Sequence, residues 1–186
     1  GGDLGRIGLN YSPANPDVLY AVAEATEGKG GVFKSTDRGA SWEKQGGYTS
    51  SGNYYQKIFC DPKDVNKVFV INAYMVISKD GGKTFSNLGE KSKHIDNHSL
   101  WINPKNTDQY LVGCDGGVYE SFDAGENWNF KANLPVTQFY KVATDNAFPF
   151  YHIHGGTQDN FSMGGPSRTL SANGIMNSDW YFTSLG

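Results

Sequence analysis

The residues best equipped for chemistry form one short run, His94-Ile95-Asp96-Asn97-His98. In an extended chain successive side chains alternate between two faces, so His94, Asp96 and His98 would share one face. Imidazole and carboxylate groups arranged in this way can bind a divalent metal, or the carboxylate can orient the two imidazoles. The alternative is a polar loop whose histidines bond to nearby backbone groups. We favour the polar loop, and predict no cofactor and no metal site.

Two carboxylates facing one cleft would support a different chemistry, the hydrolysis of glycosidic bonds. Such pairs stand about 5–5.5 Å apart in retaining enzymes and about 6.5–9.5 Å apart in inverting enzymes. Most acidic residues of this chain fall in predicted turns, and Asp115, followed by Gly116 and Gly117, is interpreted as a further turn residue. Asp96 and Asp159 are the pair that remains, and they are the candidate catalytic residues.

A second group of polar side chains surrounds Asp159. Amides and aromatic rings together are typical of sites that recognise sugars or peptides. The same groups are as common where a loop satisfies its own backbone. The predicted ligand-binding residues are His94, His98, Gln138, Tyr140, Gln158 and Asn160.

A repeated pattern indicates the elements that must position these residues. It reads Ser-x-Asp-x-Gly-x-(Ser/Thr/Asn)-aromatic, and its three aspartates are spaced 43 residues apart. This period is typical of four-stranded propeller blades. The Ser and Asp side chains suit a tight turn, and Gly can adopt positive φ there. The predicted structural residues are Ser35, Asp37, Gly39 and Trp42; Ser78, Asp80, Gly82 and Phe85; and Ser121, Asp123, Gly125 and Trp128.

Each copy is preceded by three short apolar segments, which predicts one antiparallel four-stranded meander per repeat. A fourth repeat keeps its first two strands, Gln138–Thr144 and Phe150–His154, but Gly155–Arg168 replaces the pattern before a closing strand at Asp179–Phe182. The predicted fold is therefore all-β, with four blades in one segment of a larger β-propeller domain. The predicted blade bounds are about 5–48, 53–93, 97–134 and 137–186.

Composition supports this fold and narrows the function. The chain of 186 residues has 24 glycines, 14% aromatic residues and a net charge of −3. It lacks the basic stripe of a nucleic-acid-binding protein and an apolar run long enough to span a membrane. The two cysteines, Cys60 and Cys114, are interpreted as free thiols rather than as a disulfide. A start without Met favours a segment of a longer chain.

The repeated patterns resemble the Asp-boxes, or bacterial neuraminidase repeats, of sialidases, xyloglucanase-type glycoside hydrolases and Vps10/sortilin receptors. The wider layout is similar to that of the large bacterial sortilin-like repeat proteins, which are often labelled glycosyl hydrolase. That similarity rests on Gly5–Gly8, Asp96–Pro104, Gln138–Val142 and Gly156–Asn160. The resemblance implies a secreted protein, extracellular or periplasmic, whose Asp-boxes lie on outer hairpins away from an axial site.

Sialidase chemistry is not expected from this chain. A sialidase binds its substrate carboxylate with three arginines, and the chain has only Arg6, Arg38 and Arg168, with Arg38 inside a repeated pattern. The leading prediction is a scaffold, or a module that binds a protein or glycan at its axial face, with further blades as partners. The alternatives are a glycoside hydrolase and a purely structural repeat.

Overall fold

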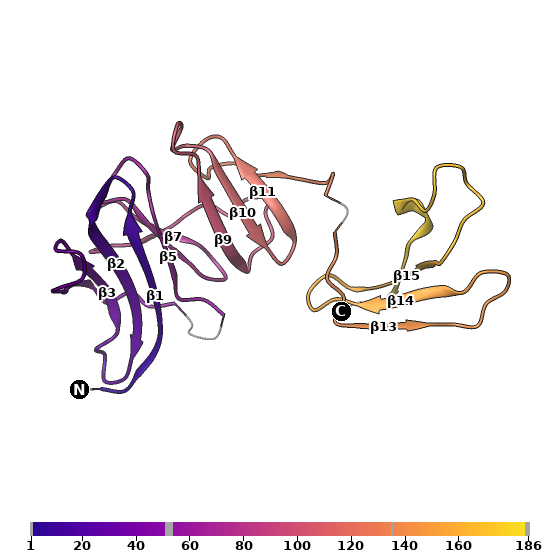
Figure 1. The fold of residues 1–186 in the computed structure, drawn as a ribbon, viewed down its shortest axis with the longest axis horizontal. Coiled ribbons are helices and arrows are strands. Elements are labelled where there is room, and N and C mark those ends of the chain that lie inside the picture. Colours follow the sequence, from indigo (N-terminus) through magenta and orange to yellow (C-terminus); the bar gives the residue numbers. More distant parts are fainter. Residues whose placement is uncertain (1, 51–53, 135, 185–186) are drawn as a thin grey trace. The chain divides into compact units, whose positions relative to one another are not determined.

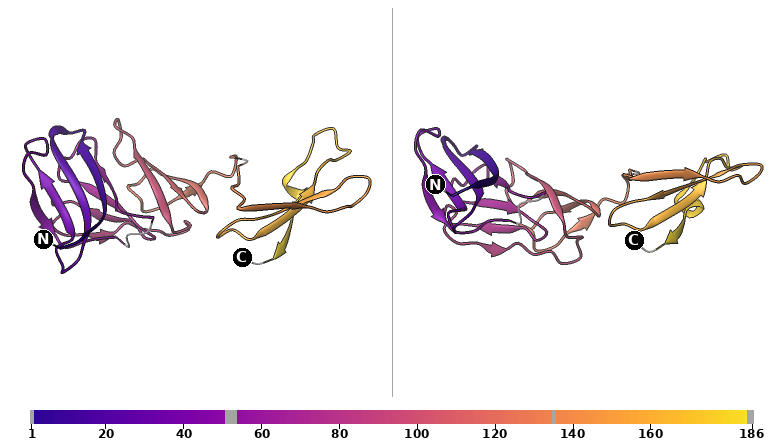
Figure 2. Two further views of the ribbon diagram at one scale, coloured as in Figure 1. Left: turned by 60° about the horizontal axis from the view of Figure 1, so that its bottom comes forward. Right: turned by 90° about the horizontal axis from the view of Figure 1, so that it is seen from below.

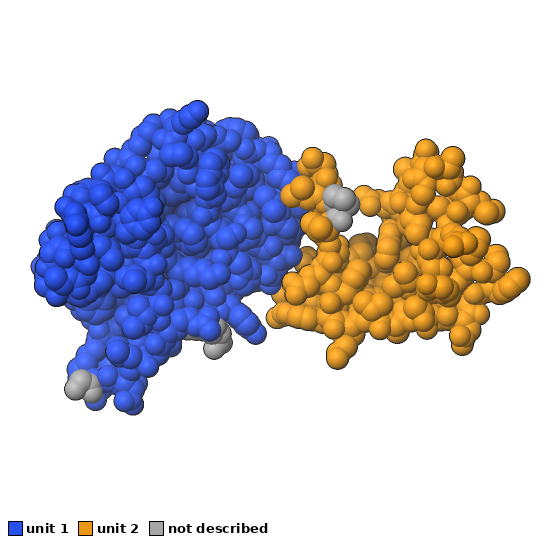
Figure 3. Space-filling model, viewed as in Figure 1, with its two compact units in different colours: residues 1–131 blue, residues 132–186 orange. Residues whose placement is uncertain are grey.

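The computed structural model describes residues 2–50, 54–134 and 136–184. The chain divides into two compact units, residues 1–131 and 132–186 (Figure 3). The predicted blade bounds at 53 and 186 lie outside the described residues, and the prediction that all four blades belong to one domain stays a prediction.

The strands form four antiparallel sheets of four strands, and within each sheet the strands pair in chain order. The all-β fold predicted from the sequence is confirmed. Unit 1 holds three of the sheets (Figure 1). The first contains β1 (Leu4–Ser12), β2 (Asn15–Ala25), β3 (Gly31–Ser35) and β4 (Glu43–Gly46). The second contains β5 (Lys57–Cys60), β6 (Val68–Ile71), β7 (Val76–Ser78) and β8 (Ser86–Asn87). The third contains β9 (Asn97–Ile102), β10 (Tyr110–Cys114), β11 (Gly117–Ser121) and β12 (Asn129–Phe130).

The fourth sheet lies in unit 2. It contains β13 (Lys141–Thr144), β14 (His152–Gly156), β15 (Ser162–Pro166) and β16 (Tyr181–Ser184), with a short 3₁₀ turn at Asn177–Asp179. In the described part of the chain, no helix has the length and apolar character needed to cross a membrane.

The second sheet is buried on both faces, because each face packs against a neighbouring sheet (Figures 1 and 2). Val68 and Val70 of β6 contribute to the core shared with the first sheet. Phe69 and Ile71, which alternate with them, contribute to the core shared with the third sheet. All four side chains are fully buried. The continuous apolar run of β6 is therefore explained by cover on two sides rather than one.

The three repeated patterns fold into the same turn between the third and fourth strands of their sheets. The serine hydroxyl donates to the aspartate at 2.7–2.8 Å, and the backbone N–H of the glycine donates to the serine oxygen at 2.8–2.9 Å. The residue two places after the glycine donates to the same aspartate from both its backbone and its side chain. Gly39, Gly82 and Gly125 all have φ near +90°, a conformation that favours glycine.

These hydrogen bonds favour the ionised aspartate. Donation from Ser41 lowers the pKa of Asp37 to about 2, and donation from Asn127 lowers the pKa of Asp123 to about 2. Donation from Thr84 likewise holds the pKa of Asp80 well below its usual range. The three carboxylates are thus charged acceptors at neutral pH, each used by its own turn.

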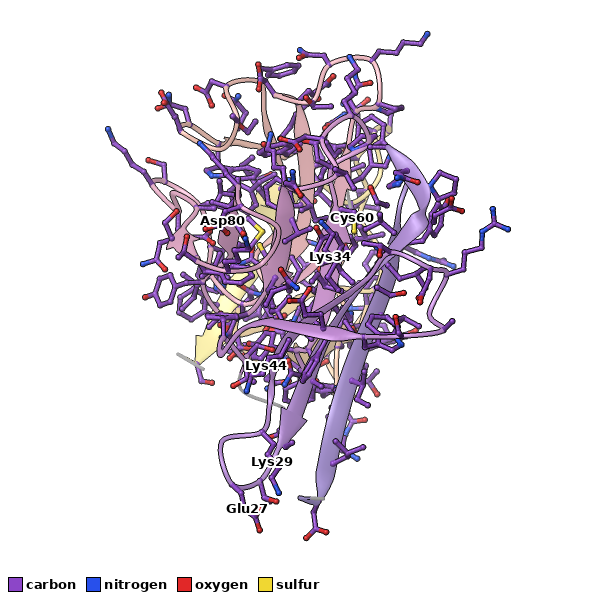
Figure 4. All side chains as sticks on the ribbon, turned by 90° about the vertical axis from the view of Figure 1, so that its left-hand side faces the viewer. Glu27, Lys29, Lys34, Lys44, Cys60 and Asp80 are labelled. Atoms are coloured by element: carbon purple, nitrogen blue, oxygen red, sulfur yellow. The ribbon has the colours of Figure 1, made fainter. Side chains whose placement is uncertain are left out.

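The loop between β2 and β3 spans residues 26–30, against residues 72–75 between β6 and β7 and residues 115–116 between β10 and β11. Glu27 and Lys29 lie at its tip and form an exposed ion pair with an N–O distance of 2.6 Å (Figure 4). Both cysteines are free, as predicted, with Cys60 buried in the core between the first and second sheets.

The sequence analysis assigned no strand to Gly155–Arg168, but Gly155 and Gly156 end β14 and Ser162–Pro166 form the third strand of this sheet. The glycines and proline of this segment hide it, because they have low β-propensity. Gly164 and Gly165 are needed there because a side chain would not fit. A Cβ atom at Gly165 would lie 2.6 Å from the Trp180 ring, and one at Gly164 would lie 2.9 Å from Tyr181.

Truncating the centre of the doubly covered sheet should be costly. We expect Phe69→Ala to lower the free energy of unfolding by about 3–5 kcal/mol, because it opens a cavity in a fully buried core. Urea denaturation measures this. Phe122→Ala is the control, because Phe122 is 57% exposed and should change stability little. Equal losses from the two variants would contradict the described packing.

The turn aspartates predict acid sensitivity. A carboxyl whose pKa is lowered on folding stabilises the folded state above its unfolded pKa of about 3.8, and this contribution disappears as pH falls through the folded pKa. We therefore expect Tm to fall between about pH 4 and pH 2. The variant Asp37→Asn/Asp80→Asn/Asp123→Asn should have a lower Tm at pH 7 and a flatter profile in this range. An unchanged slope would refute the assignment.

Candidate functional site

Five polar side chains gather at one end of the second and third sheets, and we call them the Asp96 cluster: Tyr55, Lys57, Asp96, His98 and Asp115. Tyr55 and Lys57 lie at the start of β5, and Asp96 and His98 lie at the start of β9. Asp115 follows β10 in the turn to β11. Strand starts and a strand end meet here because the sheets are antiparallel.

The cluster is joined by short contacts between sheets. The Tyr55 hydroxyl donates to Asp96 Oδ1 at 2.8 Å, and the Tyr55 ring stacks on His98 with centroids 5.9 Å apart. Nε2 of His98 lies 2.7 Å from Asp115 Oδ1. Lys57 Nζ donates to the His98 carbonyl at 2.8 Å. Asp96 and His98 are both half-buried, so the cluster combines fixed geometry with access to solvent.

The backbone that carries Asp96 is anchored on both sides. Its N–H donates to the Ala73 carbonyl at 3.0 Å, and its carbonyl accepts from the Asp115 N–H at 3.2 Å. Asp96 has φ of 62° and Gln56 has φ of 66°, in the left-handed region that non-glycine residues rarely adopt. Strained residues of this kind persist only where the surrounding contacts impose them, and they often mark functional sites.

A buried ion pair supports the loop from below. Lys93, whose side chain is completely buried, lies 2.5 Å from Glu90 Oε2 and donates to Asn97 Oδ1 at 2.5 Å. Glu90 accepts from the Met75 N–H at 2.9 Å, which ties the loop to the second sheet. The Lys93 ammonium also lies 5.5 Å from the centre of the Trp128 ring. These contacts fix Asn97 between the cluster residues Asp96 and His98.

The structure does not place His94, Asp96 and His98 on one face in the way that an extended strand would. The left-handed backbone at Asp96 interrupts the extended run. Nδ1 of His94 lies 2.8 Å from the Ile95 carbonyl, while His98 pairs with Asp115. Within residues 2–50, 54–134 and 136–184, no group of three or more His, Cys, Asp or Glu side chains is arranged to hold a metal ion.

A groove begins at the cluster and follows strands β1 and β5. Its volume is about 460 Å³, and it runs between β1 and β5. Tyr55 and Lys57 belong to both the cluster and the groove, which Arg6, Ile7 and Leu9 line on the other side. The groove thus offers apolar surface, two cations and a phenol beside the Asp96 carboxylate.

The remaining predicted residues lie in unit 2, where the structure joins two of them. The Tyr140 hydroxyl donates to Gln158 Oε1 at 2.5 Å. The Asn160 N–H donates to Thr157 Oγ1 at 3.0 Å, which closes the loop. Gln138 and Asp159 are exposed. Since Asp96 belongs to unit 1 and Asp159 to unit 2, their pairing as catalytic carboxylates stays a prediction.

Sequence reasoning missed another polar group in unit 2. Asp145 Oδ2 lies 2.9 Å from Nδ1 of His152 and 3.5 Å from Nε2 of His154. The N–H of His152 donates to the same carboxylate, which holds the pKa of Asp145 well below its usual range. The alternating His-x-His of β14 was the available signal. Sequence reasoning also interpreted Asp115 as a simple turn residue, although it pairs with His98.

Comparisons with known proteins agree with the fold. No protein-family model matches the chain. An oligoxyloglucan reducing end-specific xyloglucanase of Emericella nidulans is 25% identical over 149 residues, which covers 72% of this chain and 18% of that protein. The chain is therefore similar to this xyloglucanase and spans a small part of its length.

Two solved structures resemble the chain in fold. The GH74 enzyme of Niastella koreensis has a TM-score of 0.57 at 19% identity, covering 94% of this chain and 29% of that one. The GH74 xyloglucanase from Xanthomonas campestris has a TM-score of 0.53 at 17% identity, covering 95% and 30%. These likenesses confirm the predicted β-propeller type of fold.

The buried ion pair between Lys93 and Glu90 should contribute strongly to the stability of unit 1. We expect Lys93→Met to lower the free energy of unfolding by about 3–5 kcal/mol, since it leaves the Glu90 carboxylate buried without a counter-charge. The double variant Lys93→Met/Glu90→Gln should recover part of the loss in urea denaturation. Lys29→Met is the control, because its ion pair with Glu27 is exposed and should contribute little. Similar effects from Lys93→Met and Lys29→Met would contradict the role of the buried pair.

Proposed function

We propose that this chain is part of a glycan-binding β-propeller and that the Asp96 cluster, with its adjoining groove, is the binding site. The observation that carries the proposal is the Tyr55–Asp96–His98 arrangement, in which a half-buried carboxylate and a stacked aromatic pair lie side by side. Carboxylate oxygens accept from sugar hydroxyls, and aromatic faces pack on sugar rings.

The relationship to a xyloglucanase supports a glucan as the ligand class. The net charge of −3 and the two carboxylates of the cluster, Asp96 and Asp115, would both repel a polyanion. They therefore favour a neutral glycan. Lys57 is engaged by the His98 carbonyl, and Arg6 lines the far side of the groove. A neutral chain of sugars that lies along the groove and reaches the cluster would contact carboxylates, aromatic rings and cationic side chains.

We assign the repeated turns to the Asp-box class, with a structural role, and the layout to the sortilin-like repeat proteins. The hydrogen bonds of the turns support this role, because each aspartate is used by its own turn. A glycan ligand also fits a secreted protein, extracellular or periplasmic. Further blades and a protein ligand are the other proposed partners.

Glycoside hydrolysis is the second candidate, and the xyloglucanase relationship favours it. Asp96 would be one of the two carboxylates. Asp159, or a carboxylate from a further blade, would be the other. In this reading the hydrogen bond from Tyr55 orients Asp96.

Binding of xyloglucan oligosaccharides, measured by titration calorimetry, tests the proposal. We expect Asp96→Asn to weaken binding about 10–100-fold, because a hydrogen bond to a charged group contributes about 1.5–3 kcal/mol. His98→Ala should also weaken binding. Asp108→Asn, a change of the same type at an exposed residue in the turn between β9 and β10, is the matched control.

The outcomes separate the candidates. Unchanged binding in Asp96→Asn and His98→Ala would show that the Asp96 cluster is not the binding site. The absence of binding to any glucan would contradict the proposed class of ligand. Release of new reducing ends by the unchanged protein, lost about 10²–10⁴-fold in Asp96→Asn, would favour the hydrolase. Binding without release would favour the binding module.

A further inference from the structure

The same type of interface joins the first sheet of unit 1 to the second and the second sheet to the third. The first sheet packs on the second with one face, while its other face has no partner among the sheets of unit 1. Corresponding positions are found by counting from Pro13, Pro62 and Pro104, which follow the first strand of each sheet. Four and two residues before these prolines stand Leu9 and Tyr11 in the first sheet, Ile58 and Cys60 in the second, and Leu100 and Ile102 in the third.

Burial at these positions differs sharply. Ile58 and Cys60 are 3% and 8% exposed, because they pack in the core shared with the first sheet. Leu100 and Ile102 are 6% and 8% exposed, in the core shared with the second sheet. Their counterparts Leu9 and Tyr11 are 60% and 57% exposed. The first sheet thus displays, uncovered, the apolar face that the other two sheets bury against the preceding sheet.

The aromatic residue of the repeated turn shows the same difference. Trp128 is 6% exposed, and its indole N–H donates to the carbonyl of Gly89, just beyond the last strand of the preceding sheet, at 2.7 Å. Phe85 stacks on Tyr48 at 4.9 Å, beyond the last strand of the first sheet. Trp42 is 40% exposed, and its indole N–H donates to Gly39 of its own turn.

Glycines give a third, independent sign. A Cβ atom at Gly46 would lie 2.7 Å from the Gly82 carbonyl, and one at Gly89 would lie 3.1 Å from the Gly125 carbonyl. The end of one sheet therefore abuts the turn of the next at a distance that glycine permits. Gly39, the counterpart of Gly82 and Gly125, is approached within 4 Å only by Trp42 among the described neighbours.

Leu19 pairs with Tyr11, and Phe33 pairs with Ala21, the partner of Leu9, so both lie on the same face of the sheet. We propose that the face formed by Leu9, Tyr11, Leu19, Phe33 and Trp42 is an interface that docks a further four-stranded blade of the same repeat. The occupant would present aliphatic side chains to Leu9 and Tyr11. A glycine after its fourth strand would abut Gly39, and the carbonyl of that residue would accept the Trp42 indole N–H. Continuity with the two interfaces already present specifies this partner. The inference is independent of the proposed glycan site.

Hydroxyl-radical footprinting of the native protein, isolated from its source, tests the proposal. Tyr74, which is 54% exposed, and Tyr20, which is fully buried, are reference residues of the same type as Tyr11. We expect Tyr11 to react as slowly as Tyr20. Reaction at the rate of Tyr74 would overturn the proposal. Protection that is lost on dilution would mean that a second copy covers the face, which also overturns it.

One pair of variants tests whether this face is buried, and a crosslinking residue identifies its occupant. Leu9→Ala should lower Tm by about as much as Leu100→Ala, because each would truncate an aliphatic side chain packed between two sheets. No change in Leu9→Ala beside a clear loss in Leu100→Ala would overturn the interface. A photo-crosslinking residue in place of Leu9 should join a peptide from another blade of this repeat, and a crosslink to any other segment would overturn the assignment.

Discussion

A β-sheet with two apolar faces must be covered twice, and the fold of unit 1 depends on this constraint. Val68 and Val70 point to one neighbour, while Phe69 and Ile71 point to the other. Sheet packing of this kind buries all four residues of β6 completely. A sheet covered on both sides has no free face, so its polar chemistry is confined to the ends of the strands, where loops meet.

The Asp96 cluster lies at one of these ends, and it shows how a packed scaffold holds polar groups in place. Lys93 and Glu90 form an ion pair inside the loop, so the backbone at Asp96 can adopt a conformation that it would otherwise avoid. The strain is offset by contacts that fix the orientation of the carboxylate toward Tyr55. A ligand meeting this site would find its acceptors already oriented, which lowers the entropic cost of binding.

What the sequence could predict was set by the range of the interactions. The repeated turns were predicted because Asp37, Asp80 and Asp123 bond within five residues of chain, so their chemistry is visible locally. The Asp96 cluster was found only in part, because Tyr55 is 41 residues from its partner Asp96. Strand β15 was missed because the space required by aromatic neighbours outweighed the low β-propensity of its glycines.

The strictly sequential pairing of strands has a consequence for how the protein folds. Within each sheet, every strand bonds to its neighbours in the chain, and each turn of the Ser-x-Asp type closes over a few residues. Low contact order within a sheet favours rapid formation of each meander, since little loop entropy is lost before contacts are gained. Docking of one meander on the next brings together residues such as Tyr20 and Val65, which are 45 positions apart. The slow step of folding should therefore be the assembly of finished sheets, and sheets would be added to the stack one after another along the chain.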